Sequence, residues 1–105
     1  MNYKTLLESI GNTPLVKMQF ESPATILAKL EYLNPGGSIK DRTALYMIEQ
    51  AEKKGSLKPG GTIIEASSGN QGIAAAMIGA IKGYKVIITV AKKVSAEKKA
   101  ALQAY

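Results

Sequence analysis

The chain has 105 residues, 46% of them hydrophobic and 21% charged, which is the composition of one ordinary globular domain or of part of one. It contains neither cysteine nor histidine, so disulfides, thiol nucleophiles, Ser-His-Asp triads and the usual zinc sites are excluded. The net charge of +6 comes largely from paired lysines without interleaved aromatic residues, and we therefore expect a solvated surface and no nucleic-acid partner.

The first third of the chain predicts short elements separated by breakers. Residues 3–10 predict a short helix that Gly11 and Asn12 close, and residues 15–18 predict a strand after Pro14. Residues 25–31 alternate well enough to predict a second strand. The N-terminus lacks a cleavable apolar segment, and no apolar run approaches the roughly 20 residues that cross a bilayer. We expect a cytoplasmic chain with no membrane partner.

A glycine-containing turn at residues 34–37 precedes the first long helix. Ser38 is the expected N-cap, with Asp41 three residues later as its capping-box partner. Apolar residues then recur at helical spacing from position 44 to position 51, and Gly55 is the expected stop. The sequence thus places Lys40 where the turn enters the helix.

The remaining chain alternates strand and helix. Residues 62–66 predict a strand, and a Ser-Gly-Asn loop leads into an alanine-rich helix that ends at Gly83. Residues 85–90 predict a strand covered on both faces, and Ser95 begins a last helix that includes residues 98–104. This alternation predicts an α/β fold with a mostly parallel open sheet and right-handed crossovers, which we expect to be layered as a three-layer sandwich.

Lys40 is the candidate nucleophile, because no cysteine or histidine competes with it. The positive end of a helix dipole and burial beneath a ligand would both favour its neutral form, which can bond covalently to an aldehyde cofactor. Spacing alone leaves a second interpretation open, in which Lys40 is an exposed lysine in the first turn of a helix.

The loop Ser67-Ser68-Gly69-Asn70-Gln71-Gly72 is the candidate anion site. Two hydroxyls, two amides and backbone N–H groups precede a predicted helix, which suits a carboxylate ligand. Read alone, the same residues also fit a simple helix cap. The loop matches neither the dinucleotide fingerprint nor the P-loop.

Several motifs in register give the chain a family resemblance. They are Ile10-Gly11-Asn12-Thr13-Pro14-Leu15-Val16, then Lys29-Leu30-Glu31 leading to Asn34-Pro35-Gly36-Gly37-Ser38-Ile39-Lys40-Asp41-Arg42, then Ser67-Ser68-Gly69-Asn70-Gln71-Gly72-Ile73. In order and spacing the whole chain closely resembles the N-terminal part of the cysteine synthase and cystathionine β-synthase family, the fold-type II pyridoxal-phosphate enzymes. The three-layer sandwich expected here is therefore incomplete relative to that family.

The resemblance implies a function and residue roles. The expected reaction is β-replacement on an activated serine by a thiol, giving cysteine or a related thioether amino acid. Lys40 resembles the lysine that holds pyridoxal 5'-phosphate and moves the α-proton, and Asn70 resembles the asparagine that bonds the cofactor's ring hydroxyl oxygen. Ser67, Ser68, Gly69, Asn70 and Gln71 resemble the loop that binds the substrate carboxylate, and no metal is expected.

This chain departs from the family pattern at two points, and both leave specificity open. Gln71 replaces a short hydroxyl residue, and Val90-Ala91-Lys92-Lys93 stands where a Met-Pro-Glu segment is usual. Alternative functions are therefore β-elimination on serine or threonine, or a noncatalytic fragment or interaction module of the same fold.

The resemblance also predicts how the chain is completed. We expect residues 1–105 to be the N-terminal part of the enzyme, with about residues 1–35 packing on a second domain. Leu6, Leu7 and Leu15 would then lack a partner surface in this chain alone. We expect activity to need a C-terminal part, supplied by the same polypeptide or by a complementing chain, and the full-length enzyme to be a homodimer.

Overall fold

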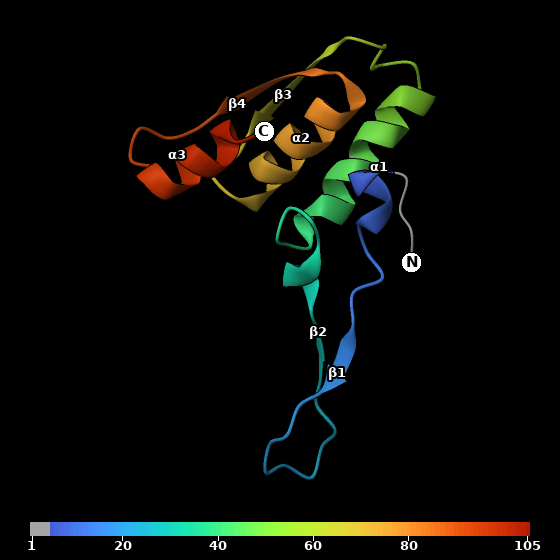
Figure 1. The fold of residues 1–105 in the computed structure, drawn as a ribbon, viewed down its shortest axis with the longest axis vertical. Helices are drawn as coiled ribbons and strands as arrows, with labels where there is room; N and C mark the ends of the chain where they lie inside the picture. The colour runs from blue at the N-terminus through green and yellow to red at the C-terminus, as the bar shows by residue number, and fades with distance from the viewer. Residues whose placement is uncertain (1–4) are drawn as a thin grey trace.

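Three α-helices, four strands and two short 3-10 helices form the part of the chain that the computed structural model describes, residues 5–105. In chain order they are η1 (Leu6–Ser9), β1 (Leu15–Lys17), β2 (Leu27–Lys29), η2 (Glu31–Leu33), α1 (Lys40–Lys53), β3 (Thr62–Ala66), α2 (Asn70–Lys82), β4 (Lys85–Thr89) and α3 (Ala96–Gln103). A helical body carries β3 and β4 on one side, and β1 and β2 extend away from it (Figure 1).

The parallel pair β3–β4 is built as the alternation of strands and helices predicts. Ile63 pairs with Val86 and Ile64 with Ile87, with α2 as the crossover between the strands. Gly83 ends α2 in the left-handed conformation with a φ of 76°, so the predicted stop is confirmed. Tyr84 N–H then donates to the Gly79 carbonyl at 2.8 Å and turns the chain into β4.

The core lies between α1, α2 and the inner face of the β3–β4 pair. Its buried residues are Ala44, Ile48, Ala74, Met77 and Ile78. The small side chains of α2 allow close approach to its neighbours, and a Cβ on Gly79 would lie 2.2 Å from Cγ2 of Val86. Val86 and Ile88 also line a cavity together with Leu102 of α3, so α2 and α3 cover the same face of the pair.

The opposite face of the β3–β4 pair is open. Burial alternates along β4. Ile87 is 39% exposed to solvent, and Ile64 on β3 is 69% exposed. The expectation that residues 85–90 form a strand covered on both faces is therefore wrong for this chain. The physical reason is that the described helices pack against one face only.

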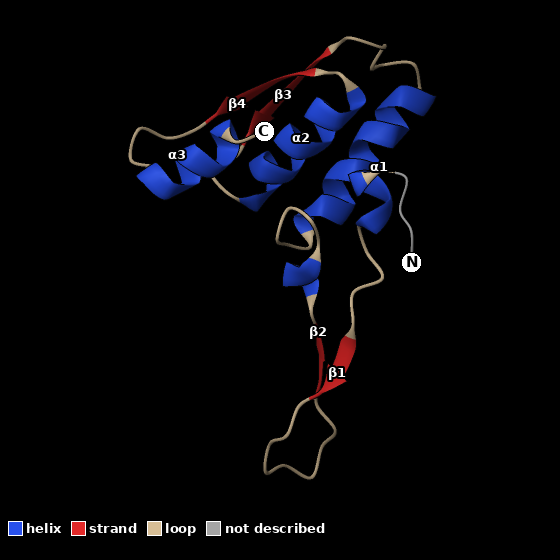
Figure 2. Cartoon of the chain, viewed as in Figure 1, coloured by secondary structure: helices blue, strands red, loops and turns tan. Residues whose placement is uncertain are grey.

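β1 and β2 form a separate antiparallel pair rather than part of a parallel sheet. Val16 pairs with Ala28, and the two strands with their connecting loop project from the helical body (Figure 2). The radius of gyration is 16.1 Å, compared with about 13 Å for a compact domain of 100 residues. The antiparallel direction follows from a connection too short to hold a crossover helix.

Several predicted boundaries change in the structure. The helix expected at residues 3–10 is the shorter η1, and residues 3 and 4 lie outside the described part. The strand expected at residues 25–31 ends at Lys29, because Glu31 begins η2. Leu7 packs against the core, whereas Leu6 and Leu15 are 48% and 58% exposed as expected.

The two predicted helix caps have different outcomes. Ser95 is the N-cap of α3, and its hydroxyl oxygen accepts the Lys98 N–H at 3.4 Å. At α1 the N-cap is Ile39, which gives no side-chain bond, so the capping box of Ser38 and Asp41 is wrong. Asp41 instead reaches back to Gly36.

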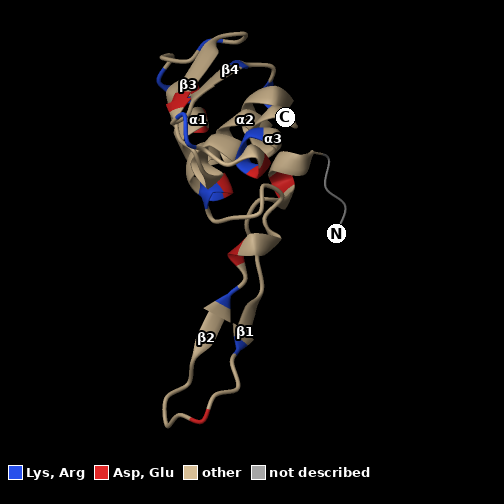
Figure 3. Ribbon diagram, turned by 90° about the vertical axis from the view of Figure 1, so that its left-hand side faces the viewer, with Lys and Arg blue, Asp and Glu red and all other residues tan. Residues whose placement is uncertain are grey.

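The described chain is thus an α/β structure with two small sheets, one parallel and one antiparallel. None of its described helices is long and apolar enough to cross a bilayer. Lysine and arginine are interspersed with acidic residues around the helical body in Figure 3, so its positive charge does not gather there as a single stripe.

Candidate active site at the starts of α1 and α2

The first turns of α1 and α2 meet at one edge of the structure. Thr43, in the first turn of α1, lies 3.0 Å from Gln71 in the first turn of α2, measured from Oγ1 to Oε1. Lys40 and Thr43 are three residues apart, so they share a helix face. Asn70 precedes Gln71 as the first residue of α2. The hydrogen bond therefore brings together the two segments that the sequence singled out.

Lys40 is the first residue of α1 and is exposed. Its backbone N–H donates to the Ser38 hydroxyl oxygen at 3.1 Å, and its carbonyl accepts from Thr43. The side-chain amine makes no hydrogen bond or ion pair with any residue in 5–105. The amine is thus open to a ligand, while the burial expected to neutralise it is not supplied by the described residues.

A turn fixed by Asp41 leads into Lys40. Asp41 is fully buried, and its Oδ2 accepts the Gly36 N–H at 2.5 Å. Burial raises the pKa of the Asp41 carboxyl, and the bond from Gly36 opposes that shift. The Gly37 N–H donates to the Asn34 carbonyl at 2.8 Å, and a φ of 83° at Gly37 is what a glycine accommodates.

A salt bridge between α1 and η2 fixes η2, which precedes this turn, against the start of α1. Arg42 binds Glu31 through two hydrogen bonds, from Nε to Oε2 at 2.8 Å and from Nη2 to Oε1 at 2.9 Å. Thr13 donates its hydroxyl to the same carboxylate at 2.6 Å. Arg42 and then Thr13 lower the pKa of Glu31 to about 2. Glu31 therefore stays ionised and keeps Arg42 in place.

Neighbouring polar residues extend this network to the N-terminal segment. Buried Asn34 donates to Oε2 of Glu31 at 3.0 Å, and its Oδ1 accepts the Gly11 N–H at 2.8 Å. Lys29 donates to both the hydroxyl and the carbonyl of Thr13. The chain before β1, the end of β2 and the start of α1 are thus fastened at one point.

The Ser-Gly-Asn loop leaves several hydrogen-bond donors available, while the Gly69 N–H is bonded within the loop. The Ser67 hydroxyl oxygen accepts the Gly69 N–H at 3.2 Å, which leaves the hydroxyl proton free for another acceptor. The first bond into α2 runs from Ile73 N–H to the Gly69 carbonyl at 3.2 Å. The preceding amides of α2 have no acceptor within the described chain. This donor set fits an anionic ligand, and the free amine of Lys40 fits an aldehyde.

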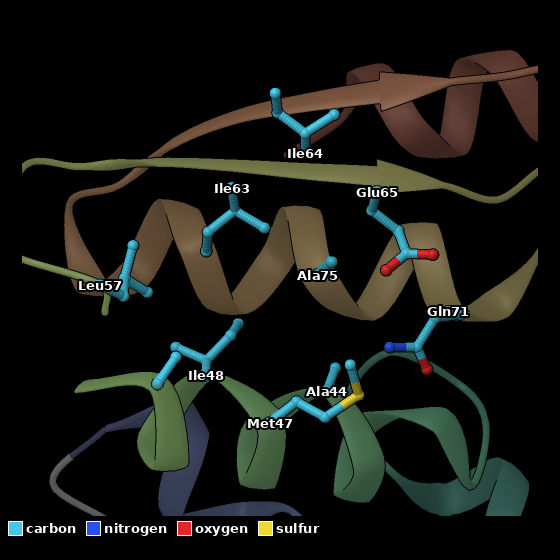
Figure 4. Close-up of a pocket in the computed structure, with 10 residues that line it drawn as sticks. Ala44, Met47, Ile48, Leu57, Ile63, Ile64, Glu65, Gln71 and Ala75 are labelled. Atoms are coloured by element: carbon cyan, nitrogen blue, oxygen red, sulfur yellow. The ribbon is translucent and has the colours of Figure 1, made fainter. Parts of the chain in front are cut away.

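Beside this edge lies an open cavity of about 210 Å³ between α1, α2 and β3. Its walls are mainly aliphatic, and Gln71 and Glu65 lie together at one end, opposite Leu57 (Figure 4). Among residues 5–105, no group of three or more acidic, histidine or cysteine side chains is placed to hold a metal ion.

The structure shows contacts near this edge that the sequence did not predict. Thr43 contacts the loop, Asp41 fixes the turn, and Arg42 with Glu31 fastens the flanking segments. Thr13, Asn34 and Arg42 belong to two of the motifs that carry the family resemblance, and their polar side chains in those motifs were the available signal. Thr43 carried only one signal, its position one helical turn after Lys40.

Known proteins of similar sequence match almost the whole of this chain. The family model described as "Pyridoxal-phosphate dependent enzyme" matches residues 6–105. Cysteine synthase B from Pseudomonas aeruginosa is 53% identical to the chain, and the match covers 100% of this chain and 36% of that protein. The chain thus spans little more than a third of that relative's length.

Solved structures of similar proteins superpose closely. A hydrogen sulfide-producing enzyme from Fusobacterium nucleatum matches with a TM-score of 0.95 and 46% identity, over 100% of this chain and 35% of the other. An O-acetylserine dependent cystathionine β-synthase from Helicobacter pylori gives a TM-score of 0.90 and 40% identity, over 99% of this chain and 36% of the other.

Proposed function

The chain belongs to the pyridoxal-phosphate dependent enzyme family, and from this premise we propose that it supplies the cofactor-binding lysine and the carboxylate-binding loop of a β-replacement enzyme. The proposed substrates are an activated serine and a thiol, and the product is cysteine or a related thioether amino acid. The relatives named cysteine synthase and the O-acetylserine dependent synthase support this choice of reaction.

The proposed roles rest on the free donors at this edge and, for Gly69, on the family resemblance of the loop. Lys40 would hold the cofactor and move the proton of the substrate α-carbon, because its amine is exposed and unpaired among the described residues. Asn70 would donate to the cofactor's ring hydroxyl oxygen. Ser67, Ser68, Gly69, Asn70 and Gln71 would bind the substrate carboxylate. When bound, pyridoxal 5'-phosphate supplies the electron sink that stabilises negative charge on the α-carbon.

The observation that carries the proposal is the 3.0 Å contact between Thr43 and Gln71. It ties the first turn of α1, which begins with Lys40, to the first turn of α2, which begins with Asn70. Lys40 and a set of anion-binding N–H groups therefore lie in adjacent first turns, beside the end of β3 where α/β folds bind their ligands.

We propose that the rest of the family fold completes the site and the core. Phe20, Leu15 and Leu27 on the projecting hairpin are 62%, 58% and 53% exposed. Apolar surface of this kind marks an interaction site. We propose that residues 1–35 pack on a second domain, and that further chain covers Ile64 and Ile87 to form the third layer of the sandwich. The homodimer and the cytoplasmic location stay predictions.

Covalent trapping tests this function. The protein, completed by the remaining family fold, is incubated with pyridoxal phosphate, reduced with borohydride and digested, and the modified peptide is mapped. We expect the label on Lys40, and Lys40→Ala should remove it. Lys54→Ala, at the other end of α1, is the matched control and should keep it. A label elsewhere, or none in the completed protein, would contradict the proposal.

Product analysis separates the reaction types. With O-acetylserine and sulfide the proposed enzyme should form cysteine, whereas release of pyruvate without cysteine would favour β-elimination. A noncatalytic interaction module would take up no cofactor in either experiment, while still binding the complementing part through its exposed hairpin.

A further inference from the structure

Thr43 has one hydroxyl hydrogen and two acceptors within reach. Oγ1 lies 3.0 Å from the Lys40 carbonyl oxygen and 3.0 Å from Oε1 of Gln71. The Lys40 carbonyl, at the start of α1, also receives the backbone N–H four residues later in the helix. The hydroxyl can therefore serve Gln71 without leaving the helix carbonyl unpaired.

The orientation of the Gln71 amide decides what it offers to a ligand. One end of an amide accepts hydrogen bonds and the other donates two, so only the amino end attracts a carboxylate. With Oε1 bound to Thr43, the Nε2 group has no partner among the described residues and lies on the cavity side of the side chain (Figure 4). The hydroxyl thus selects the donor end for the ligand.

We propose that Thr43 is a positioning residue for the amino-acid substrate: it holds Oε1 of Gln71 so that Nε2 donates to the substrate carboxylate. The inference rests on the proposed function, because it takes the loop at Gln71 as the carboxylate site.

A ligand pair with and without the carboxylate gives the test. L-serine and ethanolamine differ only in that group, and titration of the cofactor absorbance of the holoenzyme yields a dissociation constant for each. Thr43→Val keeps the shape of the side chain and removes the hydroxyl. Because Thr43→Val removes a single neutral hydrogen bond, we expect it to raise the dissociation constant of L-serine about threefold to tenfold. The dissociation constant of ethanolamine should not change.

Three further variants make the result specific. Thr43→Ser keeps the hydroxyl and should restore L-serine binding. In a Gln71→Ala background, Thr43→Val should have no further effect, because the two residues act through one contact. Glu65→Gln removes a negative charge near Gln71, so it should not weaken L-serine binding relative to ethanolamine binding. If it weakens L-serine binding relative to ethanolamine binding as much as Thr43→Val does, the Gln71 amide serves Glu65 and the proposal is overturned.

Two failures are distinguishable. Absence of a borohydride label on Lys40 in the unmodified holoenzyme would overturn the proposed function itself. If the label is present and Thr43→Val weakens the binding of both ligands equally, only the role of Thr43 is overturned. The same holds if it weakens the binding of neither ligand. The label should be equal in Thr43→Val and the unmodified protein, which confirms that the variant folds.

Discussion

The carboxylate of Asp41 occupies the space where a side chain on Gly36 would begin. A Cβ built on Gly36 would lie 2.3 Å from Oδ1 of Asp41 and 2.9 Å from Oδ2, the atom that accepts the Gly36 N–H. Asp41 is fully buried and cannot move aside cheaply. The turn before Lys40 thus needs glycine at position 36 for room rather than for an unusual φ.

Gly36→Ala should therefore destabilise the folded protein and displace the turn. Overpacking of this kind costs about 1–3 kcal/mol, and the variant also disturbs the bond between Asp41 and the Gly36 N–H. Denaturant unfolding of the protein and the variant measures the change. The matched control is Gly69→Ala, because a Cβ at Gly69 meets nothing within 4 Å and the backbone there is extended. Equal unfolding free energies for the two variants would contradict the prediction.

The sequence predicted the elements that local rules determine. Gly83 and Ser95 mark helix boundaries through their own backbone or side chain, and both were placed correctly. The parallel pair β3–β4 followed from the strand–helix–strand order. Ser38 and Asp41 failed as a cap, because the carboxylate of Asp41 finds a stronger, buried partner in Gly36, and a local pattern does not reveal that competition.

Structural features that depend on contacts between distant segments could not be predicted from local sequence rules. The antiparallel pairing of β1 with β2 and the meeting of Thr13, Glu31 and Arg42 join residues up to 29 positions apart. The motifs that contain these residues supported a family resemblance, yet nothing in their spacing showed that they bind one another. The loop and Lys40 were located from the sequence, whereas the Thr43 contact that joins them required the structure.

Glu31→Gln should make the stability of the protein less sensitive to acid. Hydrogen bonds from Arg42 and Thr13 lower the pKa of Glu31 from 4.5 to about 2 in the folded chain. A carboxyl with a lowered folded pKa stabilises the fold above its unfolded pKa, and this contribution is lost as the pH falls through the folded value. Between pH 4.5 and 2 the unfolding curve of the unmodified protein should thus shift more than that of Glu31→Gln.

The control for this experiment is Glu21→Gln, which changes an exposed acid in the hairpin loop and should keep the acid sensitivity of the unmodified protein. The other carboxyls are the same in all three proteins, and of these Asp41 responds to Glu31→Gln, because burial and, to a smaller degree, the charge of Glu31 raise the pKa of Asp41. Identical melting curves for Glu31→Gln and Glu21→Gln across this pH range would show that the salt bridge does not act as described.

Ser95→Ala should loosen the start of α3. The hydroxyl oxygen of Ser95 accepts the Lys98 N–H, and loss of such a cap typically costs about 1 kcal/mol. Hydrogen exchange of the amides at the start of α3 measures the effect locally, and Ser95→Asp should retain protection because its carboxylate can accept the same bond. Unchanged exchange in Ser95→Ala would contradict a capping role.

Gly79→Ala tests whether glycine in the middle of α2 is required by its neighbour β4. Alanine at a helix interior should gain about 1 kcal/mol from helix propensity, but the added Cβ would lie 2.2 Å from Cγ2 of Val86. Overpacking costs about 1–3 kcal/mol, which outweighs the gain in helix propensity, so the single variant should be less stable than the unmodified protein.

Val86→Ala removes the clashing methyl group. In that background Gly79→Ala should become stabilising, because Cβ of residue 86 lies 3.7 Å away and permits ordinary contact. Denaturant unfolding of the four proteins gives the sign directly. If Gly79→Ala destabilises equally in both backgrounds, the close approach of α2 to β4 is not what selects glycine at this position.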